Sequence, residues 1–161
     1  MKVSREDLIY AAGFFDGEGS IGIYEMGSSP KKRQTAHFAL VMNVTGTSQS
    51  IIMWWKNTFG GRIARVCNSH RDVRRADSWK WCCDAKMARE VLELLVPYLK
   101  LKKVEAEIAL EFQRHKDSYP AWSHRNSKGR NTKLPDNVVQ FRRELADKLK
   151  AQKRSYKESW W

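Results

Sequence analysis

The chain has 161 residues, of which 42% are apolar, and a formal net charge of +12 at pH 7. This length suits one domain with a packed core, and seven tryptophans argue against a disordered chain. The large positive charge predicts a polyanionic partner, with nucleic acid first and an acidic membrane surface second.

The terminal segment and the cysteine pattern indicate an intracellular location. No apolar run is long enough to span a bilayer, and the N-terminus lacks the features of a secretory signal. Cys67, Cys82 and Cys83 have no metal-binding spacing, and the four histidines are scattered. We therefore expect free thiols in a reducing intracellular compartment, no membrane association and no zinc site.

The first predicted element is an apolar helix. Ser4 and Asp7 resemble a capping box, with aspartate replacing the usual glutamate or glutamine. Apolar residues then recur at helical spacing, namely Leu8, Ala11, Ala12 and Phe15. Because Ile9 and Phe14 make the opposite side apolar too, this helix must be buried or paired with another helix. The small residues at 11–13 would let a second backbone approach closely.

Two hairpins separated by a helix follow. Strands are predicted at 21–26 and 36–44, a helix at 48–60, strands at 62–67 and 78–83, a helix after Asp84, a helix through 101–112, and a last helix through 138–149. The expected fold is α+β, with the order αββαββα and appended C-terminal helices. One antiparallel sheet would carry helices on one face and leave the other free. We expect a single domain over 1–161, with a core at 4–116 and a helical extension at 134–152.

The first helix runs into an acidic turn, in which glycines follow Asp16 and Glu18. Acidic side chains are locally unfavourable at a helix C-terminus, because the helix dipole places partial negative charge there. Carboxylate oxygens and the carbonyls exposed by Gly17 and Gly19 suit a hard cation such as Mg²⁺. One such turn is too small for a whole site, so a symmetric pair of helices with nucleic-acid phosphates would complete it. On physical grounds alone, both acids can equally be turn and capping residues.

The segment AAGFFDGEG at 11–19 resembles the LAGLIDADG motif of homing endonucleases. The similarity extends to HFALVMNVT at 37–45 and YLKLKK at 98–103, so it covers about 4–115. The resemblance implies a saddle-shaped αββαββα fold whose sheet lies in the DNA major groove. It also implies that members with one motif act as homodimers, with the motif helices packed across the two-fold axis.

The resemblance assigns roles to residues by their position in the motif. Glu18 matches the metal-binding acid, Gly17 would offer its carbonyl to the metal, and Lys102 matches the basic residue near the active site. Asp16 would belong to the helix end and the dimer interface, together with Ala11, Ala12 and Gly13. The implied cofactor is Mg²⁺ or another divalent cation such as Mn²⁺. Lys102 can otherwise be an ordinary solvated lysine.

The sequence departs from the family pattern after the second strand. Gly46 and Ser50 occupy places where related single-motif enzymes have polar, water-organising residues. Gln49 lies nearby but out of register and would substitute after a local shift, and we include it with Glu18 and Lys102 among the predicted catalytic residues. This departure leaves open whether cleavage survives.

Basic and polar residues of the two hairpins are the predicted DNA contacts. Base-edge contacts would give sequence choice, and phosphate contacts would give affinity. The set consists of Tyr24, Lys31, Lys32, Arg33, His37, Asn43, Arg62, Arg65, Arg71, Arg74, Arg75, Ser78 and Lys80. For each single member, a solvated surface position is nearly as good an interpretation.

The preferred interpretation is a homodimeric, metal-dependent endonuclease that cuts both strands of a long pseudo-palindromic double-stranded DNA site. The first alternative keeps the fold without cleavage, as in a maturase that binds intron RNA. The second is a basic transcriptional regulator that uses the same sheet. Metal-dependent nicking separates the enzyme from both alternatives.

Overall fold

The computed structural model describes residues 3–26, 37–66, 77–119 and 134–158. The predicted contacts Lys31, Lys32, Arg33, Arg71, Arg74 and Arg75 lie outside these ranges, as does Cys67. The elements are α1 (Arg5–Glu18), β1 (Gly19–Met26), β2 (His37–Gly46), α2 (Gln49–Phe59), β3 (Arg62–Val66), β4 (Ser78–Asp84), α3 (Ala85–Leu95), α4 (Lys103–Ser118) and α5 (Asp136–Glu158). The predicted order of elements is confirmed.

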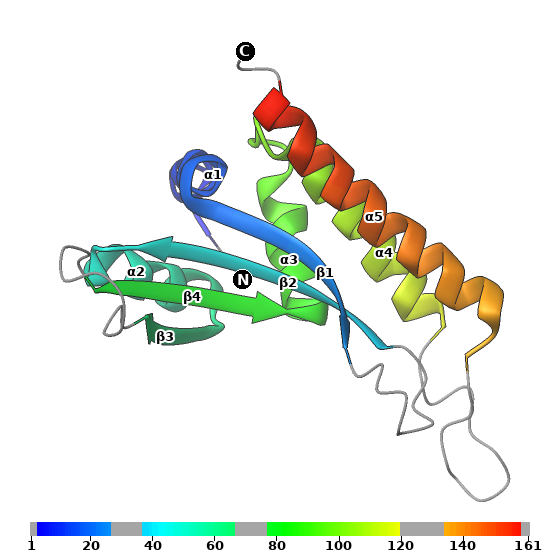
Figure 1. Ribbon diagram of the computed structural model, residues 1–161. Helices are drawn as coiled ribbons and strands as arrows, with labels where there is room; N and C mark the ends of the chain where they lie inside the picture. Colours follow the sequence, from blue (N-terminus) through cyan, green and yellow to red (C-terminus); the bar gives the residue numbers. More distant parts are fainter. Residues whose placement is uncertain (1–2, 27–36, 67–76, 120–133, 159–161) are drawn as a thin grey trace, which may run out of the picture.

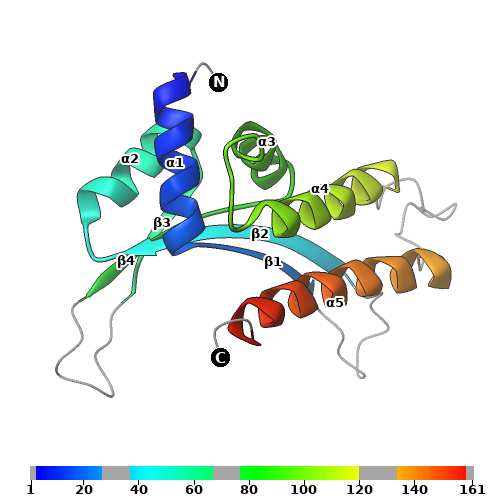
Figure 2. The same cartoon turned by 90° about the horizontal axis from the view of Figure 1, so that it is seen from above.

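The four strands form one antiparallel sheet in the order β1-β2-β4-β3. The two hairpins therefore meet through β2 and β4, which pair from Val41 opposite Asp84 to Gly46 opposite Trp79. Figure 1 shows the chain from the side, and Figure 2 shows α1, α2, α3 and α4 on one side of the sheet, with α5 beside the edge at β1. The α+β fold with an open sheet face is confirmed, and we call the uncovered side the open face.

The start of α1 is capped as predicted. The backbone N–H of Asp7 donates to Ser4 Oγ at 3.0 Å, which satisfies one of the free amides of the first turn. The helix then continues to Glu18, and β1 begins at the next residue, Gly19, with no loop between them. A Cβ on Gly19 would lie 2.1 Å from the buried ring of Phe15, so only glycine fits at this junction.

Aromatic side chains fill the core between the sheet and the first two helices. Trp55 of α2 stacks at ring-centroid distances of 6.2 Å from Phe15, 4.9 Å from Phe59 and 5.0 Å from Trp81. The indole N–H of Trp81 donates to the carbonyl of Gly60 at 2.6 Å. Both tryptophans are fully buried, which confirms that they pack in the core and do not stack on bases.

Several local predictions were wrong in detail. Ser48 and Asp84 occupy the N-cap positions of α2 and α3, but neither side chain accepts a hydrogen bond from its helix. The helix predicted after Asp84 buries Ala88, Val91, Leu92 and Leu95, and Met87 is exposed. The helix predicted through 101–112 begins at Lys103, which leaves Leu101 before it and exposed, and Val104 and Phe141 are exposed as well.

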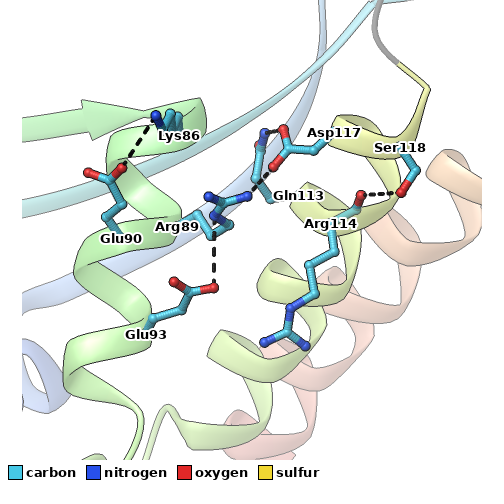
Figure 3. Close-up of polar contacts among 8 residues, drawn as sticks. All are labelled: Lys86, Arg89, Glu90, Glu93, Gln113, Arg114, Asp117 and Ser118. Atoms are coloured by element: carbon cyan, nitrogen blue, oxygen red, sulfur yellow. Dashed lines mark hydrogen bonds and ion pairs between the residues drawn. The ribbon is translucent and has the colours of Figure 1, made fainter.

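An ion-pair network joins α3 to α4, as Figure 3 shows. The Arg89 guanidinium contacts Asp117 of α4 and lies 3.8 Å from Glu93 of its own helix. Gln113 donates to the other oxygen of Asp117 at 2.8 Å. These contacts fix the C-terminal half of α4 against α3. Within the described residues, no helix is both long and apolar enough to cross a membrane.

Candidate metal-binding turn and nucleic-acid interface

Glu18 is the last residue of α1, directly before β1. It is exposed and lines an open pocket together with Phe14 of α1, with residues from the end of β2 to the first turn of α2 and with the first residue of β4, namely Thr45, Gly46, Thr47, Ser48, Ile51 and Ser78. Among the described residues, no three His, Cys, Asp or Glu side chains gather into a group that can hold a metal ion. Within the described part of one chain, Glu18 therefore offers only one carboxylate to a metal ion.

Asp16 has a role inside its own chain. Its carboxylate accepts hydrogen bonds from the backbone N–H groups of Lys100 at 2.8 Å, Leu101 at 3.1 Å and Lys102 at 2.9 Å. The Lys102 ammonium in turn donates to the backbone carbonyl of Asp16. Asp16 thus ties the end of α1 to the segment that starts α4, which is the helix-end role that the resemblance implied. Its place at a dimer interface stays a prediction.

Replacing Asp16 with alanine should lower the free energy of unfolding by about 3 kcal/mol, because it leaves backbone amides without an acceptor. The variant Asp16→Asn keeps one oxygen acceptor and should lose less. Urea unfolding followed by tryptophan fluorescence would measure both changes. Equal stability of Asp16→Ala and the native chain would contradict this role.

The Lys102 side chain is half-buried and points to the base of α1. Its contact with the carbonyl of Asp16 places a cation beside the acidic turn, two residues before Glu18 in the chain. Gln49, in contrast, is exposed as the first residue of α2 and is not among the residues that line the Glu18 pocket. Their catalytic roles stay predictions, and only Lys102 lies against the turn.

Polar residues at the end of β2 were missed by the sequence reasoning. Thr45, Thr47 and Ser48 line the Glu18 pocket, and Ser50 lies beside them with its hydroxyl 2.9 Å from that of Ser48. A Cβ on Gly46 would meet only Ile52 Cδ1, at 3.8 Å, so position 46 has room for a side chain that this protein lacks. The hydroxyls at 45, 47 and 48 are the polar groups that remain there.

Strand register places most predicted DNA contacts on one face. Side chains alternate along a strand, so residues paired across strands share a face. Ser20 pairs with Asn43, Asn43 with Cys82, and Cys82 with Arg62, which makes one row across the sheet. The same alternation puts Tyr24, His37, Ser78 and Lys80 on this open face. These residues therefore share the surface on which they were predicted.

The two arginines of β3 lie on opposite faces. Arg62 shares the open face and contacts Asp84 at 2.6 Å. Arg65 pairs in register with Trp79, whose row includes Gly46 on the helix side, and it contacts Asp77. The sequence left Arg62 and Arg65 as equal candidates for reading guanine, and the register favours Arg62 alone.

Two side chains of the open face have distinct surroundings. Burial lowers the pKa of His37, and the Lys116 and Arg142 cations lower it further, so this imidazole is neutral near pH 7. A neutral His37 suits a base edge better than a phosphate. A Cβ on Gly22 would lie 2.4 Å from the Tyr24 ring, which shows that this ring lies back over Gly22 on the sheet.

The described thiols are not among the residues that line the Glu18 pocket. Cys83 is buried on the core side, and this burial raises the pKa of its thiol to about 12, which makes it unreactive. Cys82, half-buried on the open face, is free as well. The described cysteines therefore agree with the prediction of unpaired thiols.

The outer side of α1 differs from the predicted interface. Ala11 and Ala12 are fully buried against their own chain, so their assignment to a dimer interface was wrong. In the middle of α1 the exposed positions are Ile9, with 49% of its surface accessible, Tyr10, with 52%, and Gly13. Tyr10 is held by Trp54, with ring centroids 5.3 Å apart in an edge-to-face arrangement. Apolar side chains and a glycine together form the outer face of α1, a name used below for Ile9, Tyr10 and Gly13.

Comparison with known proteins identifies this architecture. The structure of I-CvuI in complex with the I-CreI target superposes with a TM-score of 0.69 and 19% identity, covering 92% of this chain and 82% of that one. The archaeal intron-encoded homing endonuclease I-Vdi141I, complexed with DNA, gives 0.69 and 16%, covering 91% and 84%. The chain has the fold of the LAGLIDADG homing endonucleases.

A longer LAGLIDADG protein shares the fold as well. The LAGLIDADG homing endonuclease I-GzeII, in complex with its DNA target, superposes with a TM-score of 0.63 and 17% identity. The match covers 86% of this chain but only 43% of I-GzeII, which is therefore long enough for two units of this size. No family model matches the sequence, and no curated protein matches it either. The LAGLIDADG fold is thus recognised from three-dimensional structure.

Proposed function

We propose that this protein is a site-specific DNA endonuclease of the LAGLIDADG type that cuts both strands of a long pseudo-palindromic site as a homodimer. The observation that carries the proposal is the place of Glu18, at the end of the motif helix α1 and in a pocket beside the open sheet face. I-CvuI and I-Vdi141I, which share the fold, were solved with DNA. That this protein also binds DNA is part of the proposal.

A divalent cation fits the donor set at the acidic turn. The Glu18 carboxylate and the Gly17 carbonyl would hold Mg²⁺ or Mn²⁺, with DNA phosphate oxygens completing its shell. When bound, the ion supplies an activated water and stabilises the leaving oxygen of the phosphodiester. Lys102, tied to the carbonyl of Asp16, would keep positive charge beside that phosphate. I-CvuI was solved with DNA in the presence of 2 mM Mg, where the DNA was not cleaved, and in the presence of 2 mM Ca, which supports the choice of a divalent ion.

Homodimerisation would supply the second half of the active site. One chain offers one Glu18, whereas a double-strand cut needs an acid at each of two phosphates. The outer face of α1 would pack against its copy across a two-fold axis, because a symmetric interface uses the same patch twice. The length of I-GzeII, which can hold two units of this size in one chain, supports the same arrangement.

The open face would contact the DNA major groove. In the row from Asn43 to Arg62, the amide would pair with adenine and the guanidinium with guanine. Lys80 and Ser78 extend the same face towards the Glu18 pocket. His37 would contact a base edge at the far end of β2. Arg65, on the helix side, is left out of the proposed contacts.

A second candidate function is nucleic-acid binding without cleavage, as a maturase that binds intron RNA or as a DNA-binding regulator. Gly46 has no side chain where related enzymes carry a water-organising one, although there is room for one, and this favours the alternative. A long polar side chain there would reach the pocket and orient a water, and the hydroxyls of Thr47 and Ser48 are shorter. The two candidates share the open face and differ only in chemistry.

A randomised duplex library tests the proposal. We expect the native protein to select one pseudo-palindromic sequence and to cut both strands with Mg²⁺, but to bind without cutting in Ca²⁺ or EDTA. Removal of the metal should therefore abolish product without abolishing selection. Selection of a DNA sequence with no product in Mg²⁺ or Mn²⁺ would reject cleavage and favour the regulator. Preference for structured RNA over every duplex would favour the maturase.

A further inference from the structure

The C-terminal helix reaches back to the acidic turn through Lys153. Its ammonium donates to the carbonyl of Ile21 and lies 3.3 Å from the hydroxyl of Ser20. β1 is an edge strand, and α5 runs along its outer side, as Figure 2 shows. A carbonyl on a sheet edge needs a partner, and here the partner is a charged side chain. The strand that leaves Glu18 is therefore held from its open edge.

A buried acid lies behind this contact. Glu105 of α4 is only 3% exposed, and its Oε2 lies 4.0 Å from the Lys153 ammonium without a hydrogen-bond partner of its own. Burial raises the pKa of Glu105, and the Lys153 and Lys102 cations oppose that rise. Burial also lowers the pKa of Lys153, an effect opposed by Glu105. A buried carboxylate is costly without cations near it, and the Lys153 and Lys102 ammonium groups offset part of that cost.

The acidic turn is thus held on two sides by groups far away in the sequence. On one side, Asp16 is bound to the backbone of residues 100–102. On the other, Lys153 is bound to Ser20 and Ile21. The residues between these contacts, 17–19, include the proposed metal ligands. Side chains and carbonyls that bind a metal act well only when their supports keep them in place.

We propose that Lys153 is a positioning residue of the nuclease, which holds the strand after Glu18 against α5 and Glu105 and so fixes the proposed metal-binding turn. This inference rests on the proposed function. It predicts that the catalytic step depends on a residue of the C-terminal helix that touches neither metal nor DNA. Lys153 reaches the open face only through Ser20, at the β1 edge, and Ser20 is not among the proposed DNA contacts, so DNA affinity should change little when Lys153 is replaced.

The test compares three full-length variants with the native protein. Lys153→Met keeps the length of the side chain and removes its charge, whereas Lys153→Arg keeps the charge and the donors. Lys150→Met is the matched control, because Lys150 lies on the same helix, is exposed and pairs only locally with Asp147. Single-turnover cleavage, DNA affinity in Ca²⁺, the Mn²⁺ concentration at half-maximal rate and amide hydrogen exchange at 17–22 would be measured for each.

Lys153→Met should slow single-turnover cleavage by roughly 10- to 100-fold and raise the Mn²⁺ requirement, with native DNA affinity. Lys153→Arg should recover most of the rate, and Lys150→Met should match the native protein. Exchange at 17–22 should be faster in Lys153→Met alone. Unchanged exchange in Lys153→Met would overturn the inference, and so would a parallel loss of DNA binding and cleavage, which indicates general unfolding. If the native protein does not cut, the proposed function fails, and the exchange data still decide whether Lys153 holds the turn.

Discussion

Replacing Glu18 with glutamine should reduce DNA cleavage by roughly 10³-fold while leaving the fold and DNA binding intact. Glutamine has the same shape but no charge, so it binds a divalent cation poorly. Glu18 is exposed at the pocket, and its replacement leaves no buried group without a partner. The expected loss is therefore confined to the chemistry. In a homodimer, both chains would carry the substitution, so both proposed active sites would lose their acid.

Nicked and linear plasmid carrying the selected site would be quantified over time in Mg²⁺ and in Mn²⁺. Binding would be measured separately in Ca²⁺ and in EDTA. Glu6→Gln is the matched control, since it removes the same charge from the first turn of the same helix, away from the pocket. Native rates in Glu18→Gln would show that another group holds the metal. They would also remove the observation on which the proposed function rests.

The elements could be predicted from the sequence because their signals are local. The cap at Ser4, the alternation in β2 and the glycine after α2 each depend on residues a few positions apart. The motif alone also singled out Glu18 as the metal-binding acid, a role that stays a prediction. The sequence predicted a turn after the first helix, whereas β1 starts directly after Glu18. This direct junction depends on the buried ring of Phe15, which packs against Gly19.

The supports of the candidate site could not be predicted, because they join distant segments. Asp16 binds the backbone of Lys100, and Lys153 binds that of Ile21, contacts that no periodicity reveals. The burial of Ala11 and Ala12 was hidden for another reason: α1 is apolar on every side, so its pattern does not say which side faces its own chain. Only the packed structure separates that side from the outer face.

The DNA contacts were predicted by residue type and sorted by register. Arg62 and Arg65 are the same residue type on the same strand, so residue type does not distinguish them. The face that each occupies becomes known only from the pairing of Arg62 with Cys82 and of Arg65 with Trp79. A shift of one residue would exchange their faces. Register depends on the partner strand, and for this reason the sequence alone kept both arginines as candidates.

Replacing Gly13 with leucine should prevent the proposed homodimer, and with it the proposed double-strand cleavage, without unfolding the chain. A Cβ at this position meets nothing within 4 Å in a single chain, so the new side chain has room. In a pair of helices packed through the outer face of α1, the same side chain would force the two backbones apart. Gly13→Ala separates the stability of the single chain from that of the dimer. It should stabilise an isolated chain by about 1 kcal/mol through helix propensity, but it should weaken the packing of the two α1 helices.

Sedimentation equilibrium across protein concentrations would give the dimer dissociation constant, and thermal unfolding of diluted protein would give the stability of the single chain. Ala151→Leu, a neutral substitution at an exposed position of α5, is the control for added apolar surface. We expect Gly13→Leu to be monomeric at concentrations where the control and native proteins are dimers, and to leave duplex DNA uncut. A dimeric Gly13→Leu that still cuts both strands would place the interface away from Gly13. In that case the exposed Ile9 and Tyr10 would need another partner, and the two Glu18 carboxylates would have to meet through a different surface.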